Sequence, residues 1–334
     1  MTAPSYAPAG PGAPTRASMR VTYGGLAGRP CAVAGATMGT TWSARLTLPG
    51  ALAAAGAQAA VQAALDRVVA QMSHWEADSD LTRYNRAPTG WVDLPAPLCE
   101  VLDFGLWLAG ASEGAYDPTL GALVQAWGFG PRQRAHEPPG AAAIAAAQAR
   151  CGWQRVKRAG LRAWQPGGIE LDLSAIAKGY GVDAAARALE ALGVADYLVE
   201  VGGELRARGR RPDGLPWRVA VELPGGAHAT HVALDGHAVA TSGDYRRYFE
   251  HAGRRYAHTL DPRAGRPLQD GPVSVSVVHA GCMQADALAT ALMVLGLEAG
   301  LRFAQRHAVA ALFAVQAGDG WQLHATAAFA AHAA

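Results

Sequence analysis

Five strand-like segments follow one another between residues 197 and 278, and this run constrains the fold more than any other feature. In chain order they are YLVEV (197–201), WRVAVEL (217–223), HVAL (231–234), RRYAHTL (254–260) and VSVSVV (273–278). Glycine and proline residues separate them, as is typical of turns between strands. Helical patterns occur elsewhere in the chain but do not alternate with each strand, which argues against a regular βαβ fold. The sequence therefore predicts the α+β class.

Helical periodicity is clearest outside this run. Apolar residues at 61, 65, 68 and 72 recur at steps of three and four, so the pattern predicts a helix over about 57–72. Further helices are predicted at 97–109, 119–127, 139–150, 175–192, 284–295 and 298–306. The inward face of the helix at 175–192 should carry Val182, Ala185, Leu189 and Leu192. Additional strands are predicted at 40–48, at 169–173 and in a terminal hairpin at 309–325.

Length and composition exclude or disfavour several classes of protein. The 334 residues allow one large or two ordinary domains. A content of 50% hydrophobic and 17% charged residues excludes a disordered chain. The net charge of +2, without a Lys/Arg cluster, argues against a nucleic-acid partner. The four cysteines lie far apart with no CxxC pair, which argues against zinc sites and small disulfide frameworks.

The start of the chain bears on domain organisation and compartment. Residues 1–20 are rich in Pro, Ala, Gly and Ser, which predicts a flexible leader ahead of a single domain over 21–334. This leader lacks the apolar segment of a secretory signal. We therefore expect a cytoplasmic enzyme, or a periplasmic one if an export signal has been removed. No apolar run reaches the roughly 18 residues needed to cross a bilayer, so no membrane span is expected.

The segment LDLSAIAKGYG (171–181) places a predicted helix directly after a strand. We expect the strand to end at Asp172 and the helix to begin near Ala175, with Ser174 as its N-cap. Backbone N–H groups at such a helix start can bind a phosphate, and Lys178 adds a positive charge one turn later. An ordinary capped helix with a solvated lysine explains these residues equally well.

Asp286 and Thr290 are four residues apart, so they share one face of a predicted helix. Their neighbours are small or apolar, which makes an acidic residue costly there unless it has a partner. A carboxylate, a hydroxyl and a nearby carbonyl are hard oxygen ligands of the kind that suit Mg²⁺. The alternative is a helix-start charge at Asp286 and a hydroxyl at Thr290 that bonds to its own helix.

Four further stretches have polar or glycine-rich patterns that could indicate ligand contact, and each also has an ordinary structural explanation. GATMGTTW (35–42) is either a backbone approach to a ligand or a loop before a strand, and Trp75 either stacks on a planar ring or covers the core. Asp117 in GAYDPTLG either faces a ligand or closes a turn. His258 has the ordinary pKa of a general base, although a single histidine in a strand is more often a packing residue.

Together these stretches resemble the ApbE-type FAD:protein FMN transferases. The matching motifs are MGTTW, GAYDPTLG with WGFG, DLSAIAKGYGVD, VGGEL, ATSGDYRRYF, HTLDPRAGRP and ADALATALMVLG, which follow the family's order over about residues 35–325. The resemblance implies an ApbE-like α+β fold in which two closely fused sheet-and-helix halves hold the flavin between them. It also implies Mg²⁺-dependent transfer of FMN from FAD to a Thr or Ser hydroxyl of an acceptor flavoprotein, with release of AMP.

The resemblance also assigns roles to individual residues. It implies that the Asp286 carboxylate, the Thr290 hydroxyl and the Ala175 carbonyl hold the metal. The positions implied to contact FAD are Met38, Trp75, Ala115, Tyr116, Asp117, Asp172 and Lys178. His258 matches the histidine considered as the base for the acceptor hydroxyl, so His258 and Asp286 are the residues expected to carry the catalysis.

Some positions depart from the family pattern. Glu200 and Glu204 stand where Asn and Asp are expected around the GG turn, and Ser174 with Ala175 replaces a glycine pair. The longer side chains of these two glutamates are expected to affect substrate preference. Two other functions use the same residues: a Mg²⁺-dependent FAD pyrophosphatase, in which water replaces the acceptor hydroxyl, and a non-catalytic FAD-binding protein.

Overall fold

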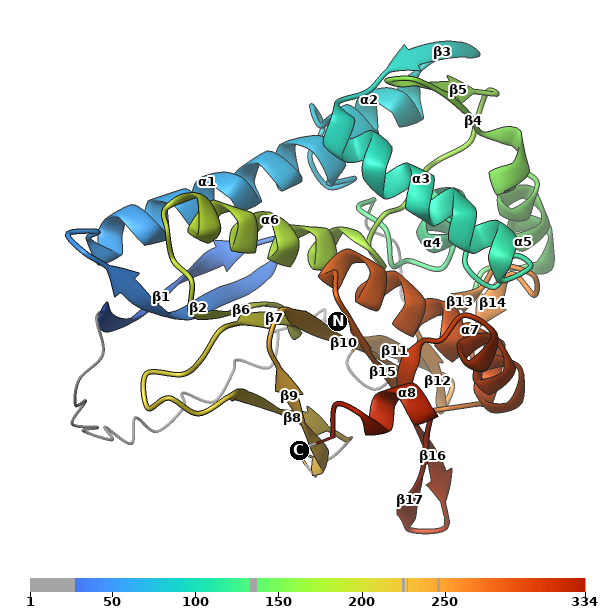
Figure 1. Ribbon diagram of the computed structural model, residues 1–334. Coiled ribbons are helices and arrows are strands. Elements are labelled where there is room, and N and C mark those ends of the chain that lie inside the picture. The colour runs from blue at the N-terminus through green and yellow to red at the C-terminus, as the bar shows by residue number, and fades with distance from the viewer. Residues whose placement is uncertain (1–27, 133–136, 224–225, 227, 245–246, 334) are drawn as a thin grey trace, which may run out of the picture.

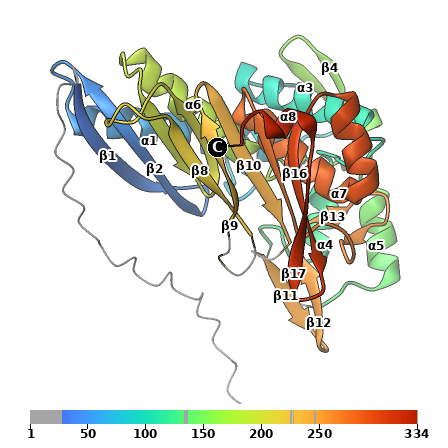
Figure 2. The same cartoon turned by 60° about the horizontal axis from the view of Figure 1, so that its bottom comes forward.

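An eight-stranded antiparallel sheet forms the centre of the computed structural model, which describes residues 28–132, 137–223, 226, 228–244 and 247–333. The strand order is β1-β2-β6-β7-β10-β15-β16-β17. The strands are β1 (Gly28–Thr37), β2 (Thr40–Pro49), β6 (Tyr197–Val201), β7 (Glu204–Arg208), β10 (His237–Gly243), β15 (Ser274–His279), β16 (Ala310–Ala317) and β17 (Gly320–Ala325). Figure 2 shows the β1–β2 hairpin at one edge of this layer and β16–β17 toward the other.

Three long helices cover one face of the sheet, as Figure 1 shows. They are α1 (Ala54–Met72), α6 (Ala177–Ala191) and α7 (Cys282–Arg306). α6 packs against both of the others, and α7 also packs on β10 and β15. Their apolar stripes form the core with the inner face of the sheet, where Trp42 of β2 is fully buried. This packing fixes the start of α6 beside the start of α7.

The remaining elements surround this framework. Beyond α1, α6 and α7 lie α2 (Asp80–Arg86), α3 (Ala96–Ala111), α4 (Gly121–Ala126) and α5 (Ala141–Gln148), with a sheet of β3 (Gly90–Asp93), β5 (Arg162–Gln165) and β4 (Lys157–Ala159). Three hairpins follow: β8 (Trp217–Glu222) with β9 (His228–Leu234), β11 (Tyr248–His251) with β12 (Arg254–Ala257), and β13 (Leu260–Asp261) with β14 (Arg266–Pro267). The short helices η1 (Trp153–Arg155) and α8 (Ala327–Ala330) complete the description. Segregated helices and antiparallel strands confirm the predicted α+β class.

Most predicted elements are present with ends shifted by a few residues. The predicted break between the two C-terminal helices is also present, as a kink. Within α7, Gly296 has a φ of 77°, so the helix is kinked where the sequence predicted a gap. The run at 254–260 is divided into β12 and β13 around His258 and Thr259. The leader at 1–20 lies outside the described residues.

Two predictions about the packing and pairing of these elements were wrong. Residues 169–173 do not form a strand, because the Asn85 side chain occupies both backbone groups of Leu171 at 2.7 and 2.9 Å and only a single bridge to Leu120 forms at Glu170. Leu192 does not face inward: it is 37% exposed, because α6 ends at Ala191 and Leu192 is its C-cap.

The helix α7 also qualifies the expectation of no membrane span. It is long and apolar enough, by length and composition, to cross a bilayer, and it is the one such helix among the described residues. In this structure 56% of its most apolar stretch is buried inside the protein. The helix packs on β10, β15 and α6, as the central helix of a globular core does.

Candidate active site

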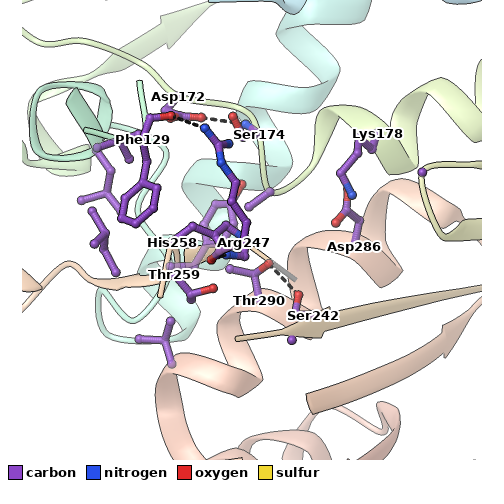
Figure 3. Close-up of a pocket in the computed structure, with 18 of the residues that line it drawn as sticks. Phe129, Asp172, Ser174, Lys178, Ser242, Arg247, His258, Thr259, Asp286 and Thr290 are labelled. Atoms are coloured by element: carbon purple, nitrogen blue, oxygen red, sulfur yellow. Dashed lines mark hydrogen bonds between the residues drawn. The ribbon is translucent and has the colours of Figure 1, made fainter. Parts of the chain in front are cut away.

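A cavity of about 550 Å³ gathers nearly all of the predicted site residues. The predicted residues that line it are Met38, Ala115, Tyr116, Asp117, Asp172, Ala175, Lys178, His258, Asp286 and Thr290. Figure 3 shows the side chains of Lys178 and Asp286 on one side of the site and Asp172 and His258 on the other. Trp75 is not among the lining residues; it is 55% exposed on the loop after α1. The cavity therefore brings together predicted residues from five separate stretches of the chain.

The position of Asp286 follows from a close crossing of α6 and α7. The Gly179 N–H donates to Asp286 Oδ2 at 2.9 Å. A Cβ atom at Gly179 would lie 2.7 Å from the Cys282 carbonyl carbon and 2.8 Å from the Asp286 Cβ, and would also overlap the Cys282 carbonyl oxygen. Only glycine permits this approach, which explains a residue that weakens the helix locally.

A second contact fixes the start of α7 against α6. Asp183 accepts hydrogen bonds from the backbone N–H groups of Cys282 at 3.0 Å and Met283 at 2.9 Å. Arg206 from β7 forms an ion pair with the same carboxylate at 2.6 Å. Asp183 thus satisfies orphan donors at the helix start and places the first turns of α7, which carry Asp286. This role was not predicted from the sequence, because Asp183 lies in the middle of α6.

The oxygen atoms around Asp286 and Thr290 meet the requirements of a hard divalent cation. Asp286 is 4% exposed, and burial raises its pKa. Thr290 Oγ1 lies 2.9 Å from Ser242 Oγ, and both hydroxyls line the cavity with Ala175. Among the described residues no group of three or more His, Cys, Asp or Glu side chains is placed to hold a metal. A site with one carboxylate and neutral oxygens fits Mg²⁺, which retains water and shares substrate phosphates.

Lys178 lies between two acidic side chains. Its ammonium forms an ion pair with Glu204 Oε1. Burial lowers the pKa of Lys178, but the charges of Asp286 and Glu204 outweigh it and raise the pKa. Burial, opposed by Lys178 and assisted by Asp286, raises the pKa of Glu204 to about 7. Around the whole cavity acidic side chains outnumber basic ones, so a divalent cation would offset an excess of negative charge.

Asp172 lies at the other side of the cavity with partners that stabilise its charge. Its Oδ1 accepts the Ser174 N–H at 2.8 Å and lies 3.5 Å from His74 Nδ1. Burial alone would raise the pKa of Asp172, but His74 and Ser174 lower it to about 2. The predicted N-cap role of Ser174 is wrong: Asp172 captures its N–H in a local turn, and α6 starts at Ala177 with Ile176 as N-cap. His74 was not predicted from the sequence.

His258 projects into the cavity as a neutral base. Its Nδ1 lies 3.1 Å from the Arg247 carbonyl oxygen, which can only accept, so Nδ1 carries the proton and Nε2 is the acceptor. Burial lowers the pKa of His258 to about 4. Arg247 also lines the cavity and donates to the Phe129 carbonyl at 2.8 Å. Arg247 was not predicted as a site residue, although it lies in the YRRYF segment of a motif shared with the family.

Asp117 closes a turn, which was the alternative to ligand contact, and it also lines the cavity. Its Oδ1 accepts from the Thr119 N–H at 2.8 Å and from the Thr119 hydroxyl at 2.6 Å, which closes a turn. α4 begins at Gly121, two residues later than predicted. The turn presents Ala115 and Tyr116 beside Asp117 at the cavity wall.

Comparison with known proteins identifies the family. A sequence model of the ApbE family matches residues 38–313. The FAD:protein FMN transferase of Vibrio cholerae is 38% identical over 304 residues, which cover 89% of this chain and 91% of the relative. The corresponding protein of Haemophilus influenzae is 36% identical and covers 89% and 90% of the two chains.

Solved structures agree with the sequence comparison. The apo form of the Pseudomonas stutzeri flavinyl transferase ApbE has a TM-score of 0.85 at 41% identity, covering 94% of this chain and 98% of that one. The flavin transferase ApbE of Vibrio cholerae has a TM-score of 0.86 at 36% identity, covering 91% and 99%. Sequence and fold therefore agree over most of the chain, and this protein belongs to the ApbE family.

Proposed function

We propose that this chain is an FAD:protein FMN transferase that attaches FMN from FAD to a Thr or Ser hydroxyl of an acceptor protein and releases AMP. The observation that carries the proposal is the cavity in which a neutral histidine, a lysine and a buried Asp–Thr pair face one another. Family membership supports the same reaction, because the curated relatives are FAD:protein FMN transferases.

The proposed reaction exchanges the phosphoanhydride bond of FAD for a phosphoester bond to the acceptor. The acceptor hydroxyl oxygen bonds to the phosphorus of the FMN half of FAD, and the bond from that phosphorus to the AMP oxygen breaks. His258 Nε2 takes the hydroxyl proton, since Nδ1–H is held by the Arg247 carbonyl. The negative charges of the FAD pyrophosphate would favour the protonated imidazole and so raise the low pKa of His258 toward the working pH.

The chain's own residues bind and orient the reactants. Lys178 supplies a positive charge for the pyrophosphate, and Met38 with the Ala115–Asp117 segment lines the space for the flavin. Asp286, Thr290 and the Ala175 carbonyl are the residues that would hold Mg²⁺. When bound, the ion would neutralise the charge that develops on the leaving phosphate. Holding the reactants in line contributes several kcal/mol, on the order of 7 or more in well-oriented systems.

The test measures transfer directly. Purified protein is incubated with FAD, Mg²⁺ and a small flavin-acceptor domain, and the intact mass of the acceptor is recorded. A gain of one FMN unit that disappears with a chelator supports the proposal, and a Thr→Val change at the modified acceptor position should abolish it. Release of FMN and AMP without a mass gain would contradict the transferase and favour the pyrophosphatase. Stable FAD binding without turnover would favour a binding protein.

A further inference from the structure

Glu204 is a buried acid that the proposed reaction leaves without a role. It is 3% exposed and is the first residue of β7, directly after the Gly202–Gly203 turn. The φ angles of these glycines are 60° and 107°, as a two-residue hairpin turn requires. The turn folds against Lys178, because a Cβ at Gly202 would lie 3.5 Å from the Lys178 Cδ. The β6–β7 hairpin is therefore built to bring Glu204 and Lys178 together.

The Lys178 ammonium interacts electrostatically with two carboxylates, those of Glu204 and Asp286. Its ammonium is paired with Glu204, while Asp286 also acts on it electrostatically, and all three side chains line the cavity. Asp286 uses Oδ2 for the Gly179 N–H. The lysine side chain is long and flexible, so its ammonium can exchange one carboxylate for the other by rotation. Which carboxylate it binds determines whether Asp286 is available to a metal.

The hydrogen bonding of Glu204 is unusual for a residue with a purely structural role. Its Oε2 atom is buried and has no hydrogen-bond partner within the described part of the chain. An unsatisfied buried oxygen destabilises the folded protein, and an apolar side chain at this position would avoid that cost. The strong contact of Glu204 is its ion pair with Lys178. Any functional effect of Glu204 should therefore act through the position of the lysine.

We propose that Glu204 is a positioning residue that holds the Lys178 ammonium away from Asp286 and so keeps the Asp286 carboxylate available to the divalent cation. Without the Glu204 charge, Lys178 would pair with Asp286, and an incoming cation would have to displace an ammonium from its only charged ligand. The inference rests on the cation site of the proposed function. It also explains why a lysine and a metal-binding carboxylate can share one cavity.

The test measures cation binding without any turnover. Full-length wild type, Glu204→Gln, Lys178→Met and the double variant are titrated with Mn²⁺ alone, and free Mn²⁺ is followed by electron paramagnetic resonance. We expect Glu204→Gln to weaken binding about tenfold or more, the factor that corresponds to breaking a charge-assisted hydrogen bond. Lys178→Met should bind at least as tightly as wild type. The double variant should match Lys178→Met, because no ammonium remains to block Asp286.

Two control variants test whether the placement of the Glu204 carboxylate matters, and not only the presence of a negative charge nearby. Glu200→Gln removes a negative charge from the same turn, where Glu200 accepts the Gly203 N–H at 2.7 Å. It should leave Mn²⁺ affinity within about twofold, since Glu200 is only half-buried and is not among the residues that line the cavity. Glu204→Asp should recover most of the wild-type affinity. Thermal unfolding of each variant verifies that it is folded.

Three results would overturn the inference. If Glu204→Gln weakens Mn²⁺ binding equally in the presence and absence of Lys178, Glu204 acts through its charge alone. If Glu204→Gln binds Mn²⁺ like wild type, the glutamate does not position the lysine. If wild type itself binds no Mn²⁺, the cation site of the proposed function is wrong and the inference falls with it. The last result is distinguishable from the first two because it appears before any substitution is made.

Discussion

Replacing Gly179 by alanine tests whether the close crossing of α6 and α7 builds the site. The added Cβ would lie 2.7 Å from the Cys282 carbonyl carbon and 2.8 Å from the Asp286 Cβ. Carbon atoms in contact prefer a separation of about 3.5–4.0 Å, so the helices must separate by close to 1 Å. Overpacking of this kind costs about 1–3 kcal/mol, against a gain in helix propensity of about 1 kcal/mol. We expect a net destabilisation of up to about 2 kcal/mol.

The same substitution should reduce function more than stability. Separation of the helices stretches the hydrogen bond from the Gly179 N–H to Asp286, which is 2.9 Å long. Bonds to a charged group are worth about 1.5–3 kcal/mol, so Mn²⁺ affinity should fall by about tenfold or more. The assays are urea unfolding and Mn²⁺ titration.

A matched control is available in α3. A Cβ at the helical Gly105 would lie 3.5 Å from its nearest neighbour, which is ordinary contact, so Gly105→Ala should be neutral or slightly stabilising. Gly179→Ala with wild-type stability and wild-type Mn²⁺ affinity would refute the reasoning about the crossing.

Four further predictions concern single residues. Asp286→Asn should abolish Mn²⁺ binding while the urea midpoint falls little, because the buried charge is expensive for the free protein; retained Mn²⁺ affinity would remove Asp286 from the metal site. His258→Gln should lower kcat by about 10²–10⁴-fold with little change in FAD affinity, and equal losses in both would make it a binding residue. Asp183→Asn should lower stability by about 1–2 kcal/mol and shift Mn²⁺ affinity in parallel, since Asp183 caps α7; unchanged values would show that the cap does not place the helix. The pKa of His258 falls from 6.5 to about 4 on folding, so its neutral form contributes stability above pH 6.5 that is lost as the pH falls toward 4. The wild type minus His258→Gln difference in unfolding free energy should therefore decrease by up to about 3 kcal/mol over that range, and a difference independent of pH would contradict the burial of His258.

The fold class could be predicted from the sequence because its signals are local. The candidate site residues were implied mainly by resemblance to the family, and most of them line one cavity. Strand patterns, helix periodicity and the spacing of Asp286 and Thr290 depend on neighbours in the chain. The failures occurred where a distant group overrides a local preference. Asn85 occupies the backbone groups that residues 169–173 would need for a strand. Asp172 likewise takes the Ser174 N–H that an N-cap role would leave free.

The site residues that were missed act across long separations in sequence. Asp183 caps a helix about 100 residues away, and its position in mid-helix gives no local sign of this. His74 contacts Asp172 across the cavity wall. The need for glycine at position 179 has no local sign in the sequence, because its reason is the Cys282 carbonyl of another helix. Such contacts follow from the tertiary arrangement, which the pattern of one sequence does not contain.

The ratio of AMP released to FMN attached tests the central claim most directly. Both products are quantified from the same reaction of protein, FAD, Mg²⁺ and acceptor, by chromatography for AMP and intact mass for the acceptor. A transferase predicts one AMP for each FMN attached, with FAD turnover that stops when the acceptor is omitted. AMP release that continues at the same rate without the acceptor would contradict the account, because water would then be the true substrate of this cavity.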